Sequence, residues 1–96
     1  MGQRFSKRPF CLVKGIWMNA GFWEYTIPIQ SLPGTTVESL VHKFKEQDYN
    51  HYITNHTNNQ KILTVYIPEE NILLDIFHSL KIPFDIHALV KPSMDK

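Results

Sequence analysis

The chain has 96 residues, of which 43% are hydrophobic and 20% are charged. This length suits one domain, and the apolar content excludes a disordered chain, because such a sequence can bury enough surface to offset the entropy of ordering. The net charge of +1 excludes both a uniformly basic coat for nucleic acid and an acidic mimic of it. A single cysteine, Cys11, excludes an internal disulfide framework and favours a reducing compartment, so we expect a cytoplasmic protein.

The sequence divides into three parts by charge and hydropathy. Residues 1–9 form a basic N-terminal tail, residues 10–91 a single α+β domain, and residues 92–96 a polar C-terminal tail. The uncharged, largely apolar stretch from Gly15 to Trp23 is about half as long as the roughly 20 apolar residues that a membrane-spanning helix requires. We therefore expect no transmembrane segment.

The start of the N-terminal tail matches the pattern for N-myristoylation, with Gly2 as the acceptor and Ser6 at the required position. A single acyl chain anchors a protein only together with a second signal, and the tail offers one in its basic side chains Arg4, Lys7 and Arg8. Peripheral contact with a membrane is thus expected only if Gly2 is myristoylated.

Two extended segments open the domain. Phe10–Met18 is rich in β-branched and aromatic residues, and Asn19-Ala20-Gly21 is a turn signal before a second run over Phe22–Gln30. Apolar and polar residues alternate in the second run, as in a strand with one buried face. We predict a β-hairpin. Because proline cannot donate a ladder hydrogen bond, Pro28 predicts that the second strand is an edge strand or carries a bulge.

A helix is predicted after the break at residues 31–34. Thr35 and Glu38 have the spacing of a capping box, in which each side chain accepts a hydrogen bond from the backbone N–H of the other residue. Apolar residues then recur at helical spacing, which predicts one face on a core. This stripe consists of Val37, Leu40, Val41 and Phe44.

The second half of the domain repeats this order. Two short strands, His51–Asn55 and Lys61–Ile67, flank a polar turn and predict another hairpin. Pro68-Glu69-Glu70 suits a helix start, because proline lacks an amide that would be unpaired there and acids favour the helix dipole. A last strand is predicted over Asp85–Val90. The stripe of the second helix is Leu73, Ile76, Phe77 and Leu80.

The fold we predict from this order is a ferredoxin-like two-layer sandwich (βαββαβ) with an additional N-terminal strand. The alternative is a β-grasp fold, because Leu12–Glu46 alone reads as a hairpin followed by a helix. A sandwich with both helices on one side leaves the other face of its sheet open, and a mixed aromatic and polar face favours a homodimer or partner surface. The residues expected on that face are Thr26, Tyr52 or His51, Thr64, Tyr66, His87 and Leu89.

The five histidines form no predicted metal or acid–base site. The best local set, Glu38, His42 and Glu46, has helical spacing on the solvent face and fits ordinary ion pairing. Asp75 and His78 read as a similar surface pair on the second helix. A three-histidine site would need convergence across the sheet, which the predicted strand order does not favour; its members would be His51, His56 and His87.

Cys11 is expected to be a small buried side chain rather than a nucleophile, since it lies between Phe10 and Leu12. We therefore predict no catalytic site, no metal site and no cofactor. A small metal-dependent nuclease is kept as the third alternative for function.

Charge is distributed unevenly along the chain. Residues 1–23 carry +4 and no acid, whereas residues 24–96 carry −3. Basic residues interleaved with aromatic residues are typical of sites for single-stranded nucleic acid and of anchors on acidic protein surfaces. With the open sheet face included, the candidate partner-binding residues are Arg4, Lys7, Arg8, Lys14, Trp17, Trp23, Tyr66 and Leu89.

These observations favour binding over catalysis. We predict a small non-catalytic binding or regulatory protein, an inhibitor or adaptor, that occupies a macromolecular partner with an acidic surface. A viral or phage-encoded origin is our hypothesis, by analogy with other small proteins of this kind. The alternative is a protein that binds single-stranded nucleic acid through its basic aromatic N-terminal segment.

Overall fold

The computed structural model of the chain describes residues 11–18 and 20–89, so the limits predicted for the two tails lie outside the described residues. Each element overlaps a segment predicted from the sequence. The strands are β1 (Cys11–Met18), β2 (Phe22–Pro28), β3 (His51–His56), β4 (Gln60–Ile67) and β5 (Phe84–Leu89), the helices are α1 (Gly34–Glu46) and α2 (Glu70–Ser79), and a short 3-10 turn over Thr57–Asn59 joins β3 to β4.

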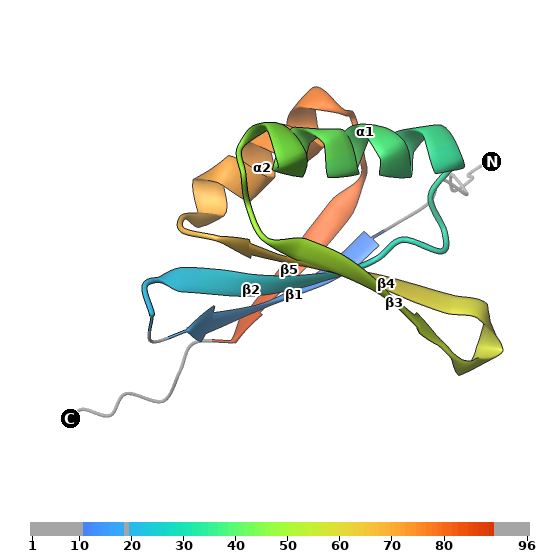
Figure 1. Ribbon diagram of the computed structural model, residues 1–96, viewed down its shortest axis with the longest axis horizontal. Coiled ribbons are helices and arrows are strands. Elements are labelled where there is room, and N and C mark those ends of the chain that lie inside the picture. Colours follow the sequence, from blue (N-terminus) through green and yellow to red (C-terminus); the bar gives the residue numbers. More distant parts are fainter. Residues whose placement is uncertain (1–10, 19, 90–96) are drawn as a thin grey trace, which may run out of the picture.

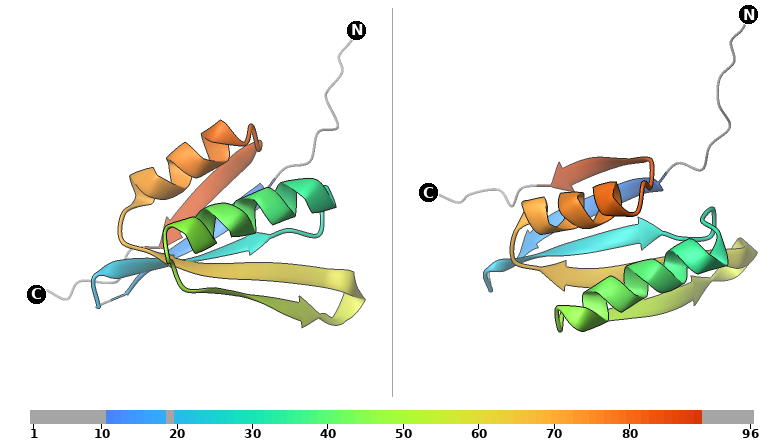
Figure 2. Two further views of the ribbon diagram at one scale, coloured as in Figure 1. Left: turned by 45° about the horizontal axis from the view of Figure 1, so that its top comes forward. Right: turned by 90° about the horizontal axis from the view of Figure 1, so that it is seen from above.

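The strands form one five-stranded mixed sheet in the order β3-β4-β2-β1-β5. Neighbouring strands are antiparallel except β1 and β5, which are parallel. Both helices lie on the same face of the sheet, with α1 over the β3–β4 side and α2 toward the β5 side (Figure 1, Figure 2). In the described part of the chain, no helix covers the other face. The architecture is therefore that of a two-layer α+β sandwich with one open face.

The additional N-terminal strand lies inside the sheet rather than at its edge. β1 separates β2 from β5, so two strands, β2 and β1, lie between β4 and β5, which α2 connects. The β2-α1-β3 unit has one strand, β4, between its members, as in a split β-α-β unit. The ferredoxin-like strand order is thus not confirmed. The hairpin and helix on which the β-grasp alternative rests are present as β1, β2 and α1.

Pro28 lies on a central strand, so the predicted edge or bulge is wrong. β2 has β4 on one side and β1 on the other. Pro28 is the last residue of β2, and the register with β1 already ends at the pair Lys14 and Thr26. Toward β4, the N–H of Ile29 donates to the Lys61 carbonyl oxygen over 3.0 Å. Pro28 lacks an N–H, but it lies beyond the last pair of the β1–β2 ladder, where no donor toward β1 is needed.

The predicted capping box does not form. α1 begins at Gly34, its N-cap is Pro33, and no side chain caps it. The N–H of Val37 donates to the Pro33 carbonyl oxygen over 3.0 Å. Thr35 is thus already inside the first helical turn, so its hydroxyl cannot accept from the amide that a capping threonine would reach.

The core lies between the sheet and the two helices. Alternate residues of β1, β2 and β4 point into it, which is the period of two expected for strands with one covered face. The stripes predicted for both helices are confirmed, with Val37, Val41 and Leu80 at their half-buried margins. The fully buried side chains are Cys11, Val13, Tyr25, Ile27, Leu40, Phe44, Leu63, Val65, Ile67, Leu73 and Phe77.

Gly15 makes room for the largest core side chain. It pairs with Tyr25 across β1 and β2, and a Cβ at position 15 would lie 2.5 Å from Tyr25 Cε1. The Tyr25 ring also stacks on Trp23, with ring centroids 5.8 Å apart. Its hydroxyl oxygen is buried and has no hydrogen-bond partner among the described residues. The glycine therefore admits a ring whose polar atom is left unsatisfied.

Candidate functional site

The open face consists of the residues that alternate with the core positions of each strand. The strand registers align them in rows that cross the sheet. Of the two residues weighed for β3, Tyr52 lies on this face, because His51 pairs with the core residue Val65. One row consists of Tyr52, Thr64, Thr26, Lys14 and His87, and the next consists of Tyr66, Glu24, Ile16 and Leu89.

Two exposed aliphatic residues of this face are on β1. Leu12 is 51% exposed and Ile16 is 37% exposed, and the exposed Lys14 lies between them. We call these three residues the β1 strip. Toward the middle of the sheet the same face is closed by its own side chains, since Thr64 is only 4% exposed. The exposed aliphatic side chains of this face are therefore on β1, and the exposed aromatic ring of Tyr52 lies on β3 at the far edge of the sheet.

Tyr66 lies on β4, in the same row as Ile16 with Glu24 between them, and is held in place by polar and aromatic contacts. Its hydroxyl donates to Glu24 Oε2 over 2.8 Å, and Glu24 pairs in register with Ile16. Hydrogen bonds with Glu24 and with Tyr52 raise the pKa of Tyr66 above its ordinary value. The ring of Phe22 meets the Tyr66 ring edge-on, with centroids 5.6 Å apart. Tyr66 is thus a neutral hydrogen-bond donor on the same face as the strip.

The two tryptophans lie on the helix-covered face and not with Lys14. Trp17 and Trp23 are cross-strand partners at the end of the β1–β2 hairpin, with ring centroids 5.4 Å apart in an edge-on arrangement. Both are half-buried, and Trp23 packs against the core. The structure therefore places Trp17 and Trp23 on the face of the sheet opposite to Lys14.

The remaining predicted partner-binding residues are at the limits of the described chain. Leu89 is the last residue of β5, and its backbone pairs in register with Ile16. The basic residues Arg4, Lys7 and Arg8 lie outside the described residues, as does Gly2 of the myristoylation pattern.

The histidines do not gather into a site. His42 forms an exposed ion-pair contact with Glu46, with His42 Nε2 3.2 Å from Glu46 Oε2, as expected for a solvated helix face. His51 and His56 lie on β3, at the opposite edge of the sheet from His87 on β5. Within residues 11–18 and 20–89, no group of three or more His, Cys, Asp or Glu residues could hold a metal ion.

Cys11 is fully buried, as the sequence predicted. Its thiol contacts the Pro28 carbonyl oxygen over 3.6 Å, and burial raises the pKa of the thiol. A buried thiol with a raised pKa is a poor nucleophile, because only the thiolate reacts readily.

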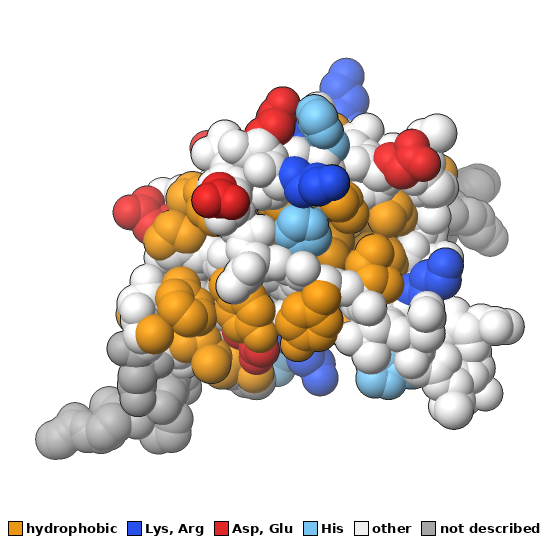
Figure 3. Space-filling view, viewed as in Figure 1, with side chains coloured by type: hydrophobic (Ala, Val, Ile, Leu, Met, Phe, Trp, Pro, Cys, Tyr) orange, Lys and Arg blue, Asp and Glu red, His pale blue; other side chains and the backbone are white. Residues whose placement is uncertain are grey.

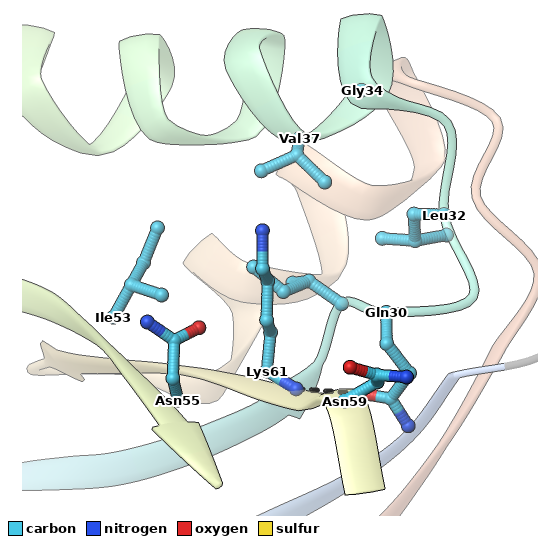
Figure 4. A pocket seen from close by; sticks show the side chains of 9 residues that line it. Gln30, Leu32, Gly34, Val37, Ile53, Asn55, Asn59 and Lys61 are labelled. Atoms are coloured by element: carbon cyan, nitrogen blue, oxygen red, sulfur yellow. Dashed lines mark hydrogen bonds between the residues drawn. The ribbon is translucent and has the colours of Figure 1, made fainter.

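A hollow of about 390 Å³ lies between the start of α1 and the β3–β4 hairpin, and the sequence did not predict it. In Figure 4, Val37 and Ile53 face this hollow, and the Lys61 side chain points across it toward α1. The backbone N–H of Lys61 donates to Gln30 Oε1 over 3.3 Å at its rim. The one sequence feature that points to this hollow is Ile53, an apolar residue in phase with the core residues of the sheet. Ile53 remains 46% exposed because α1 does not cover this end of the sheet.

A comparison of the sequence with protein-family models finds no match, and a comparison with curated proteins finds none either. Among the described residues, no helix is both long enough and apolar enough to span a membrane. Function must therefore be argued from the surfaces themselves.

Proposed function

We propose that this protein is a non-catalytic binding protein, an inhibitor or adaptor, that acts by occupying a macromolecular partner. The observation that carries the proposal is the β1 strip, which exposes Leu12 and Ile16 around the cation of Lys14. Large apolar side chains on a preformed surface with polar groups around them are typical of protein interfaces. The strip lies on a strand that is paired on both sides, so its backbone is already ordered and would lose little conformational entropy on binding.

The partner we propose is a protein with an acidic surface. Residues 1–23, which include β1, carry +4. The chain leads from Arg8 directly to Cys11 at the start of β1, and an extended chain of this length reaches roughly 11 Å at most. The positive charge of this segment would steer an acidic partner toward the strip.

Single-stranded nucleic acid is the alternative partner, because Tyr52 is an aromatic side chain 51% exposed on the same face as Lys14. Base stacking needs several aromatic faces that are free. Trp23 is instead stacked on Tyr25, and Tyr66 is engaged by Phe22 and Glu24. These contacts favour a protein partner.

We further propose that the fold is a ferredoxin-like sandwich enlarged by β1. Without β1, the other strands would follow the order β5-β2-β4-β3, with one strand inside each β-α-β unit. The cytoplasmic location and the viral or phage origin belong to the same proposal, and the reduced, buried Cys11 is in keeping with the first of them.

The test is site-specific photo-crosslinking. A photoreactive amino acid replaces Leu12 and, as the control, His42, whose side chain is 70% exposed on α1. Each variant is irradiated in a lysate of cells that contain the protein, with and without nuclease. We expect one dominant, nuclease-resistant protein adduct from position 12 that weakens with added salt, and none from position 42. A nucleic-acid adduct would favour the alternative, and equal labelling from both positions would overturn the proposal.

Once the partner is identified, the rates of association and dissociation distinguish electrostatic steering by the basic tail from anchoring by the β1 strip. Replacing Arg4, Lys7 and Arg8 together with Ala should slow association and flatten its dependence on salt, while replacing Leu12 with Ala should speed dissociation. If the triple variant associates as fast as the wild-type protein at low salt, the basic tail has no part in binding.

A further inference from the structure

β3 is an edge strand whose outer backbone groups have no partner in the described part of the chain. It pairs with β4 alone. The N–H of Tyr66 donates to the Asn50 carbonyl oxygen over 3.0 Å, which fixes the alternation of this antiparallel ladder. Even-numbered residues of β3 therefore bond to β4, whereas the N–H and C=O groups of His51, Ile53 and Asn55 point to the free edge.

This edge lacks the devices that usually prevent strands from pairing between molecules. Such edges are blunted by lysines, inward-pointing charges, prolines or bulges. From Tyr49 to Gln60 the sequence has no Lys, Arg, Asp, Glu or Pro. The β3–β4 register is continuous, without a bulge. In Figure 3 the β3–β4 hairpin at the lower right is mostly white, and no red side chain is seen on it in this view.

Apolar side chains are exposed on both sides of the same edge. Tyr52, on the open face, is 51% exposed, and Ile53, on the helix side, is 46% exposed. Ile53 borders a second hollow of about 340 Å³ under α1, together with Val37 and Val41. Figure 3 shows hydrophobic side chains gathered between α1 and the strands below it. An added strand would thus gain apolar contacts on both faces as well as backbone hydrogen bonds.

We propose that this edge pairs with β3 of a second copy of the chain, antiparallel, about a two-fold axis at Ile53. This register pairs Ile53 with Ile53 of the second copy and His51 with Asn55 of the second copy, so every outward backbone group of β3 gains a partner. On the open face it sets Tyr52 beside Thr54 of the second copy, a favourable aromatic and β-branched pair. No like-charged Lys, Arg, Asp or Glu side chains oppose one another, because the strand has none.

The flank of α1 next to this edge is also self-complementary. Glu38 and Lys45 line the hollow beside Ile53, near opposite ends of the helix. A two-fold axis perpendicular to the sheet keeps both helices on one side and runs α1 antiparallel to its copy. Glu38 then comes opposite Lys45 of the second copy, and the reverse. A second copy therefore fits this edge in both backbone and charge, whereas an unrelated strand would match the backbone alone.

The first experiment measures the oligomeric state by sedimentation over a range of concentrations. We expect a concentration-dependent dimer in the wild-type protein. Ile53→Lys should raise its dissociation constant by about tenfold or more, because two cations would face each other across the axis. Asn55→Pro, which removes one outward N–H and leaves the β4 ladder intact, should also weaken it. The matched control is Leu12→Lys, an equally exposed position on β1, which should leave the dimer unchanged.

The second experiment fixes the register by disulfide formation in a Cys11→Ala background. Residues directly opposite in a hydrogen-bonded antiparallel pair have Cα atoms about 5.5 Å apart, within the range of a disulfide. Ile53→Cys should therefore form a covalent dimer under mild oxidation, whereas Tyr52→Cys, which faces Thr54 of the second copy, should not.

Two results would overturn the proposal. One is a wild-type monomer at high micromolar concentration. The other is a dimer that survives Ile53→Lys but dissociates with Tyr66→Glu or Leu12→Lys, which would assign the interface to the open face. The pairing does not depend on the proposed binding function, because crosslinking from Leu12 and self-association through Ile53 report on separate surfaces.

Discussion

The two faces of this sheet are made from the same strands, yet they obey different constraints. On β4, Leu63, Val65 and Ile67 are buried beneath the helices, whereas Ile62 and Tyr66 alternate with them on the open face. The fully buried positions on the helix side of this strand are all apolar, because close packing selects the side chain there. The open positions on the sheet range from Leu12 to Lys14 to Glu24, because no packed layer constrains them.

We therefore expect stability and binding to depend on different side chains of this molecule. A substitution on the covered face should change the free energy of unfolding, since it leaves a cavity or a clash. A substitution on the β1 strip should leave that free energy nearly unchanged and alter only what the protein contacts.

The largest effect is expected from the two buried phenylalanines of the helices. Phe44→Ala and Phe77→Ala should each lower the free energy of unfolding by about 3–5 kcal/mol, because each leaves a cavity where a fully buried ring packs. Glu46→Ala, on the exposed side of α1, is the control and should be nearly silent. Urea denaturation measures all three. If Phe44→Ala unfolds at the same urea concentration as Glu46→Ala, the helix faces are misassigned.

The next effect tests the covered face in the opposite direction, by adding an atom. Gly15→Ala should cost about 1–3 kcal/mol, because the new methyl group would lie 2.5 Å from Tyr25 Cε1 and the ring must shift. Gly34→Ala is the matched control, since nothing lies within 4 Å of a Cβ there. Equal thermal midpoints for the two variants would show that the Tyr25 ring is free to move.

Removal of the unpaired Tyr25 hydroxyl should change the free energy of unfolding less than Gly15→Ala does, and in the stabilising direction. Tyr25→Phe should leave stability unchanged or raise it by up to about 1 kcal/mol, because the buried hydroxyl has no partner to lose. Burial, followed by the nearby charge of Glu70, raises the pKa of Tyr25. The wild-type protein should therefore lose stability as the pH rises above about 10, where the unfolded tyrosine ionises first. Denaturation at pH 8 and at pH 11 checks whether Tyr25→Phe loses less free energy of unfolding between these two pH values than the wild-type protein does.

The smallest effect on stability is expected on the β1 strip. Leu12→Ser and Ile16→Ser should stay within about 0.5 kcal/mol of the wild-type protein, because both side chains are already exposed. The same variants should reduce photo-crosslinking to the partner from a neighbouring position. A large loss of stability with unchanged crosslinking would reverse the roles assigned to the two faces.

Local patterns were sufficient for the elements and for the buried faces of the helices. Phe44 and Phe77 follow from helical spacing alone, and the β1–β2 hairpin follows from its turn residues. The insertion of β1 between β2 and β5 could not be predicted, because strand order depends on pairings between residues far apart in sequence. The missing capping box has a local cause, because α1 begins at Gly34 with Pro33 as its N-cap, which places Thr35 inside the first turn.

The candidate surface was only partly predictable. Lys14 and Trp17 are an odd number of residues apart on one strand, so a period of two already places them on opposite faces. The grouping of Lys14 with Trp17 rested instead on the composition of residues 1–23, and composition does not distinguish the two faces of a strand. The exposure of Ile53 was not predictable, because it depends on how far α1 extends across the sheet, and no local spacing encodes that distance.

The position of Cys11 gives the molecule a built-in reporter of its own opening. The thiol is buried where β1 meets the end of β2 and the start of β5, and the Cys11 N–H donates to the Pro83 carbonyl oxygen over 3.1 Å. A thiol reagent can reach it only after these strands separate, so the labelling rate measures how often this corner of the sheet opens. Because the chain contains no other cysteine, that rate can be read on the natural sequence, with and without a bound partner.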